Sequence, residues 1–241
     1  MKKLVVLALS VVAVSCNGII GNGYEISGEI KGLADGTNAF LERIDEKTGM
    51  PVAIDTVKVE KGKFTFEGKA NEPELHTVRF ENTQGGFIVI LEKGNINAKV
   101  NKDSITHAKV SGTYNNDEFN KYSASMLKIQ KEAYNFQDKN LLKMKEAQEK
   151  KDTVVVNQLR KEYSKIQEKF EIQGNKYIEE SPKSFVSVLL IKSLFNSPMP
   201  DMAKIKKYFD ALDSSVKETA AGKNIKTKIE EFEKKAGSKK N

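Results

Sequence analysis

The chain has few of the residues that most often carry out chemistry. Its 241 residues include one cysteine, Cys16, and two histidines, His76 and His107. A single cysteine excludes an intramolecular disulfide, a CxxC redox pair and a cysteine-based zinc cluster. Neither histidine has neighbours at the spacing of a zinc site, so we expect both to be structural. Motifs such as GxSxG and HExxH are absent too, and we therefore predict no catalytic residue, no cofactor and no metal.

The longest apolar run near the start is also too short to cross a membrane. Only twelve residues, Leu4 to Ser15, follow the basic Met1–Lys3, whereas a spanning helix needs about 20. A basic start, a short apolar run and small side chains before a cleavage point are typical of a secretory signal peptide. We therefore expect residues 1–15 to be a signal peptide.

The lone cysteine stands at a telling position in this segment. Val12–Cys16 resembles a bacterial lipobox, with Ala13 in place of the more usual leucine. This resemblance implies that Cys16 is lipidated and becomes the first residue of the mature chain. The alternative is an ordinary signal peptide that happens to be cut beside Cys16.

Residues 16–23 are predicted to form the lipid anchor and a short flexible tether. Asn17–Gly23 extends at most about 25 Å, so the folded body is expected close to the membrane. Asn17 is not the aspartate that, by resemblance to characterised lipoproteins, favours retention in the inner membrane. We therefore expect an exported protein anchored to the outer membrane and facing the periplasm.

Residues 24–112 have the period of β-strands. Apolar side chains recur at every second position in several short runs, and turn sequences such as Lys47–Gly49 and Lys93–Asn95 separate them. This pattern predicts an antiparallel β-sandwich or barrel-like domain. Phe87–Leu91 is apolar throughout, which predicts a central strand covered on both faces.

Residues 113–236 have the period of helices. Apolar residues step by three and four along two segments on either side of Lys150–Thr153, which predicts an antiparallel helical hairpin. Ser181–Pro182 has the residues of a helix start, and further helical segments complete a bundle. Residues 237–241 are expected to be a frayed tail. The whole chain is therefore predicted to be α+β.

The positive charge of the chain lies in its helical half. The formal charge is +7, with a net charge of −2 over residues 24–112 and of +7 over residues 113–241. Lysines alternate with glutamates, as on a solvated helix face, so we predict no nucleic-acid partner. Contact of the basic C-terminal segment with anionic lipid or an acidic partner is the alternative. An exposed sheet edge or the hairpin seam could receive a segment of an unknown protein partner, but the sequence alone does not locate such a surface.

The β-half also contains turn and strand segments that occur together in known proteins. These segments are Ser27–Gly36, Phe40–Leu41, Asp55–Thr56, Lys61–Gly68, Glu72–Leu75, Glu92–Ile96 and Val110–Gly112. Together they resemble a family of lipoprotein modules of unknown function from the Bacteroidetes group. In many relatives the module precedes a thioredoxin-like domain of the AhpC/TSA, disulfide-reductase type. This chain is expected to lack that redox domain, because it ends at Asn241, about where the domain would begin.

These observations favour a non-enzymatic function. We expect a lipid-anchored, periplasm-facing binding or scaffold module with no catalytic activity of its own. An accessory subunit to a separate thiol–disulfide or peroxide reductase is the alternative, and it depends on the family resemblance alone. A stand-alone enzyme of an unrecognised type is a third hypothesis.

Overall fold

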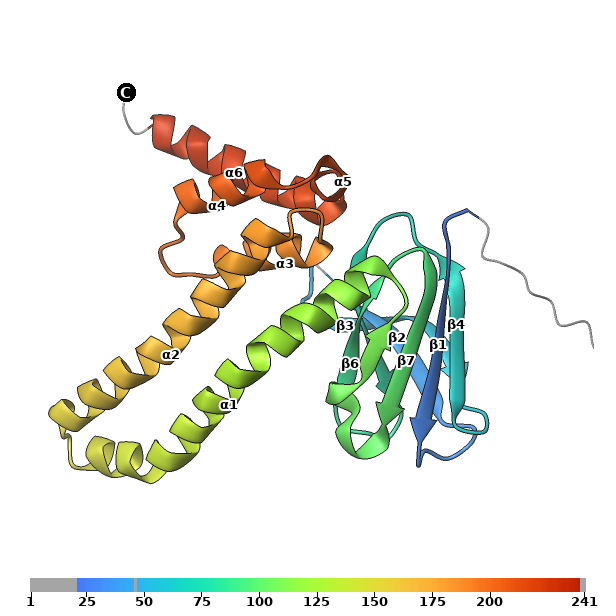
Figure 1. Ribbon diagram of the computed structural model, residues 1–241, viewed down its shortest axis with the longest axis horizontal. Helices are drawn as coiled ribbons and strands as arrows, with labels where there is room; N and C mark the ends of the chain where they lie inside the picture. Colours follow the sequence, from blue (N-terminus) through green and yellow to red (C-terminus); the bar gives the residue numbers. More distant parts are fainter. Residues whose placement is uncertain (1–20, 46, 239–241) are drawn as a thin grey trace, which may run out of the picture.

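The computed structural model describes residues 21–45 and 47–238 (Figure 1). The expected signal peptide, Cys16 and most of the tether therefore lie outside the described residues, as do residues 239–241 of the expected tail. The strands are β1 (Gly23–Lys31), β2 (Asn38–Ile44), β3 (Pro51–Lys58), β4 (Lys63–Lys69), β5 (Glu74–Phe80), β6 (Gly86–Leu91), β7 (Gly94–Asn101) and β8 (Lys109–Ser111). The helices are α1 (Tyr114–Glu149), α2 (Thr153–Glu180), α3 (Phe185–Leu194), α4 (Met202–Ala211), α5 (Ser214–Lys217) and α6 (Ala220–Ser238). A short 3₁₀ helix, Lys102–His107, joins β7 to β8.

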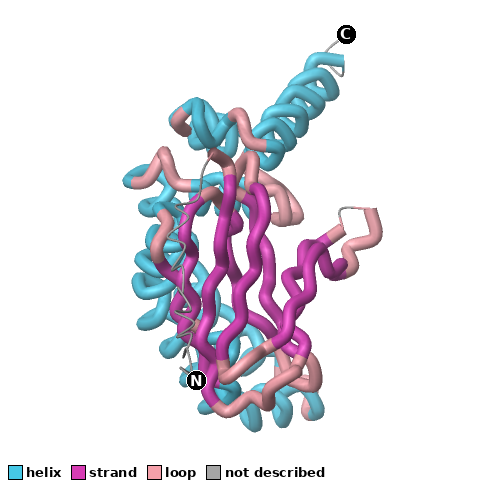
Figure 2. The backbone as a smooth tube through the Cα atoms, turned by 90° about the vertical axis from the view of Figure 1, so that its right-hand side faces the viewer, coloured by secondary structure: helices cyan, strands magenta, loops and turns pink. Residues whose placement is uncertain are grey.

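The strands form an open sandwich of two four-stranded sheets, which confirms the predicted fold class (Figure 2). The strand orders are β4-β1-β7-β8 and β3-β2-β5-β6. Neighbouring strands are antiparallel except β1 and β7, which run parallel from the pair Tyr24–Gly94 to the pair Lys31–Asn101. The chain crosses from β6 in one sheet to β7 in the other through only Glu92 and Lys93.

Aromatic side chains fill the space between the two sheets. The rings of Phe64 and Phe80 lie edge to face, with centroids 5.2 Å apart, and Phe87 packs beside them. Gly28 lies opposite Phe64 on the paired strand. A Cβ atom at Gly28 would lie 1.9 Å from the Phe64 ring, so this strand position accepts only glycine.

The helices α1 and α2 form the expected antiparallel hairpin, which projects away from the sandwich (Figure 1). At a rise of 1.5 Å per residue, α1 is about 54 Å long and α2 about 42 Å. Across the hairpin, the Tyr163 hydroxyl accepts a hydrogen bond from Gln137 Nε2 at 2.9 Å, and the Tyr163 ring packs on Phe136. Asp152 ends the turn by accepting a hydrogen bond from the Val155 amide, which caps α2.

The remaining helices pack around a second apolar core at the base of the hairpin. This core contains Phe185, Val188 and Ile191 of α3, Ile205 and Phe209 of α4, and Ile225 of α6. Ile90 of β6 belongs to the same cluster, so one strand residue connects the sandwich to the helices. In the described part of the chain no helix has the length and apolarity needed to span a membrane.

Two predictions about individual elements were wrong. The segment Phe87–Leu91 forms β6, an outer strand rather than a central one. It is nonetheless apolar because Phe87 and Val89 face the sandwich core, whereas Ile90 on the other face packs against the helices. Ser181–Pro182 does not begin a helix: the Ser181 amide donates to the Tyr177 carbonyl at 2.9 Å and closes α2.

The next helix begins three residues later. Ser184 is its N-cap and accepts a hydrogen bond from the Val186 amide at 3.1 Å. Pro182 therefore ends the preceding helix, because proline has no amide hydrogen to continue it.

Candidate functional site

The structure does not bring the two histidines into a common site. His76 in β5 is 2% exposed, and its Nδ1 atom lies 3.3 Å from the Glu74 carbonyl oxygen. Burial lowers the pKa of His76, and the nearby Glu74 groups do not fully offset this effect. His107 is exposed at the end of the 3₁₀ helix, beside Thr106. Within residues 21–45 and 47–238, no cluster of three or more His, Cys, Asp or Glu side chains could hold a metal ion.

The densest set of buried polar groups joins the sandwich to the helices, and we call it the polar junction. It consists of Asn115, Asn116 and Glu118 in the first turn of α1, with Tyr177 of α2 and Ser184 before α3. Sequence reasoning missed all five residues. A detectable signal was the Asn115–Asn116 pair at the start of a long helix, because asparagine is a poor helix former in the absence of side-chain bonds.

The Asn116 side chain forms hydrogen bonds with both the amide and the carbonyl group of one residue of β6. Its Oδ1 atom accepts from the Ile90 amide at 2.9 Å, and its Nδ2 atom donates to the Ile90 carbonyl at 2.7 Å. Asn115 links two other elements: its Oδ1 atom accepts from the Phe185 amide at 2.8 Å, while its own amide donates to Glu92. The two asparagines thus satisfy backbone groups of an outer strand and of a helix start.

Glu118 connects α1 to α2. Its carboxylate accepts from the Tyr177 hydroxyl at 2.9 Å and from Lys121 at 2.6 Å. Burial alone would raise the pKa of Glu118, but the hydrogen bonds from Lys121 and Tyr177 outweigh it and hold that pKa below its ordinary value. Burial raises the pKa of Tyr177, so the hydroxyl stays protonated and keeps donating to Glu118. Ser184 lies 3.0 Å from the same hydroxyl.

The polar junction is arranged for structure. Every buried side-chain nitrogen and oxygen atom in the described part of the chain has a hydrogen-bond partner. The bonds of Asn115, Asn116 and Glu118 are made to other parts of the same chain, so these side chains have no unpaired group aimed at solvent. We therefore assign this cluster to holding the sandwich and helices together.

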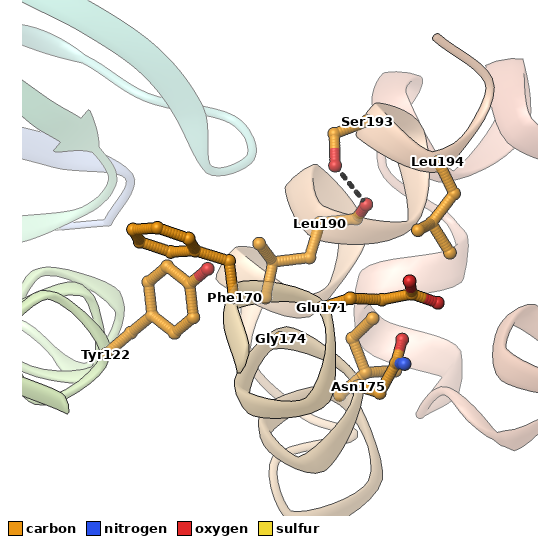
Figure 3. Close-up of a pocket in the computed structure, with 9 residues that line it drawn as sticks. Tyr122, Phe170, Glu171, Gly174, Asn175, Leu190, Ser193 and Leu194 are labelled. Carbon is orange, nitrogen blue, oxygen red and sulfur yellow. Dashed lines mark hydrogen bonds between the residues drawn. The ribbon is translucent and has the colours of Figure 1, made fainter. Parts of the chain in front are cut away.

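A half-open cavity lies at the base of the hairpin. It has a volume of about 260 Å³ and lies between α1, α2 and α3. We call it the Gly174 cavity, and Figure 3 shows its lining residues. The lining residues are Tyr122, Phe170, Glu171, Gly174, Asn175, Ile178, Leu190, Ser193 and Leu194.

The walls of the Gly174 cavity are mainly apolar and its polar groups are mostly engaged. The Tyr122 and Phe170 rings lie to one side of α2, and Glu171 and Asn175 point away from them (Figure 3). Glu171 is bonded to Lys204 at 2.7 Å, which lowers the pKa of its carboxyl. Ser193 donates to the Leu190 carbonyl within its own helix. An occupant would therefore be held by apolar contact.

Gly174 lines this cavity although its backbone conformation does not require glycine. Unlike the turn glycines, it has no positive φ, and a Cβ atom there would meet only the Tyr122 hydroxyl at 3.9 Å. A glycine within a helix costs about 1 kcal/mol relative to alanine. The residue thus lowers helix stability at a place where alanine fits. An isolated glycine inside a helical pattern is the signal that the sequence offered for this site.

Comparison with known proteins identifies one related domain. Residues 24–119 match a family described as a domain of unknown function (DUF4369). This match covers the sandwich and the first turn of α1, including Asn115, Asn116 and Glu118 of the polar junction. No curated protein matches the chain, and no solved structure matches it.

Proposed function

We propose that this protein is a non-enzymatic binding or scaffold module that receives an apolar group of a protein partner in the Gly174 cavity. The carrying observation is the glycine itself, which weakens α2 beside the cavity although alanine would fit there. Residues that lower stability without a packing reason are expected at functional positions.

The dimensions of the cavity limit what it accepts. A closed apolar cavity of about 150 Å³ holds one benzene molecule, so an open one of about 260 Å³ takes an indole-sized ring or a short alkyl group. Such groups occur as the side chains of a partner protein. A binding role of this kind requires no catalytic group from the chain.

The site is tested by filling it. Gly174→Leu places a side chain in the cavity, whereas Gly174→Ala removes little of its volume and is the matched control. We expect indole to shift the aromatic NMR signals of Tyr122 and Phe170 in the natural protein and in Gly174→Ala, and to shift neither in Gly174→Leu. Both variants should unfold at equal or higher urea, with Gly174→Ala more stable by about 1 kcal/mol.

A second measurement addresses the partner. A photoreactive benzoyl-phenylalanine in place of Ser193, at the cavity rim, should form a reproducible protein adduct in cells, and Gly174→Leu should remove it. An unchanged adduct in Gly174→Leu, together with no response to indole, would contradict a role for the cavity.

The proposal extends to the place of action. We propose that Cys16 is lipidated and anchors the module to the outer membrane, with the folded body in the periplasm. The basis is the resemblance of Val12–Cys16 to a lipobox and the position of the lone cysteine within it.

A further inference from the structure

One face of α1 carries large apolar side chains that no other part of the described chain covers. Leu127, Tyr134 and Leu141 are 59%, 68% and 68% exposed. They are seven residues apart, so they lie in one row along the helix. Met126 and Ala133, each one position earlier, are buried in the hairpin instead. The row therefore flanks the hairpin seam and is available to another molecule.

The row is symmetric about its middle residue. If a second α1 is laid antiparallel across it with the two Tyr134 side chains facing each other, Leu127 faces Leu141 of the second copy. The facing positions extend about 21 Å along the helix, from Leu127 to Leu141. A surface that complements itself in this way is the requirement for a two-fold dimer.

The charges beside the row have the same symmetry. Lys131 and Asp138 have no ion-pair partner among residues 21–45 and 47–238. Seven residues separate them along α1, about 10 Å, so they do not pair with each other. In the antiparallel arrangement Lys131 of each copy comes beside Asp138 of the other. The arrangement thus forms two ion pairs between the copies, from side chains that have no ion-pair partner within one described chain.

We propose that the protein forms a two-fold symmetric dimer through this face of α1, with the second copy antiparallel and centred on Tyr134. The last hydrogen bond from α1 to the sandwich is made by Asn120 to the Val110 carbonyl, so the overlapping part lies beyond the sandwich contact. The dimer depends neither on the Gly174 cavity nor on Cys16.

Cysteine cross-linking tests the register. In the full chain with Cys16→Ser no other cysteine remains. Tyr134→Cys in this background should form a disulfide-linked dimer on mild oxidation, because the two sulfur atoms meet at the symmetry axis. Leu142→Cys is the matched control: Leu142 is 73% exposed, but it lies eight residues from Tyr134, so the two copies of this position would be about 24 Å apart along the helices. A mixture of Leu127→Cys and Leu141→Cys should cross-link far more than either alone.

Charge exchange tests the same geometry without disulfides. Lys131→Asp should weaken dimerisation roughly three- to tenfold in analytical ultracentrifugation, because it replaces two attractive contacts with repulsive ones. Lys131→Asp with Asp138→Lys should restore the dimer. A chain that stays monomeric at 100 μM, or equal cross-linking at positions 134 and 142, would overturn the proposal.

Discussion

Asn116 does for β6 what a neighbouring strand would do. An outer strand presents unpaired amide and carbonyl groups, and these become costly when a helix covers them. Ile90 is fully buried, and the Asn116 side chain satisfies both of its backbone groups. A single side chain therefore lets a helix pack over the open edge of a sheet.

Removing that side chain should be costly. We expect Asn116→Ala to lower the free energy of unfolding by about 2–4 kcal/mol, because two buried backbone groups lose their partners. Asn120→Ala is the control, since Asn120 makes one bond to the Val110 carbonyl and should lose about 1 kcal/mol. Urea unfolding followed by circular dichroism measures both. If the two variants lost the same free energy of unfolding, the pair of hydrogen bonds to Ile90 would contribute no more than the single bond of Asn120.

Single residues were the hardest features to predict from the sequence. The Asn115–Asn116 pair is visible as a poor helix start, but its partners Phe185 and Ile90 are distant in the chain. Likewise Ser181 and Ser184 are equally good N-cap residues, and only the end of α2 decides between them. Such choices depend on tertiary contacts, which local patterns do not contain.

The contact between α1 and α2 should make the packing of these helices depend on pH. Glu118 of α1 accepts from Tyr177 of α2, and its pKa is lowered in the folded protein. A lowered carboxyl pKa stabilises the fold above the unfolded value of 4.5, and this contribution is lost as the pH falls through the folded pKa. The helices should therefore loosen from one another in acid.

This dependence is measured by comparing Glu118→Gln with the natural protein. The natural protein should lose stability to urea between pH 5 and pH 3, whereas Glu118→Gln should start less stable and lose less over the same range. Glu132→Gln serves as the control, because Glu132 forms an exposed pair with Lys169 on the hairpin. Parallel pH profiles for the natural protein and Glu118→Gln would assign the acid sensitivity to other groups.

Most elements followed from periodicity. The change from period two to period 3.6 after Gly112 predicted strands and then a hairpin, and α1 begins at Tyr114. The place of β6 in its sheet did not follow. A strand that is buried on both faces is apolar throughout, whether a second sheet or a helix covers each face. The sequence of Phe87–Leu91 therefore could not show that this strand lies at the edge of its sheet.

At the scale of the whole molecule, membrane attachment is predicted to depend on one atom, the sulfur of Cys16. Cys16→Ala should prevent incorporation of labelled palmitate and move the protein from the membrane fraction to the soluble fraction. The folded body should be unchanged, because its first residues are already held in place: the Asn22 carbonyl accepts a hydrogen bond from the Ala70 amide at 2.8 Å. Membrane retention of Cys16→Ala without any label would refute the lipobox prediction.

The length of α1 turns its first turn into a pivot. One uninterrupted helix of 36 residues leads from the polar junction to the far end of the hairpin. Over a lever of about 54 Å, a rotation of about 5° at the base displaces the far end by about 5 Å. The hydrogen bonds of Asn115, Asn116 and Glu118 therefore set the direction in which the hairpin points, and a weakened junction would widen the volume that its tip explores.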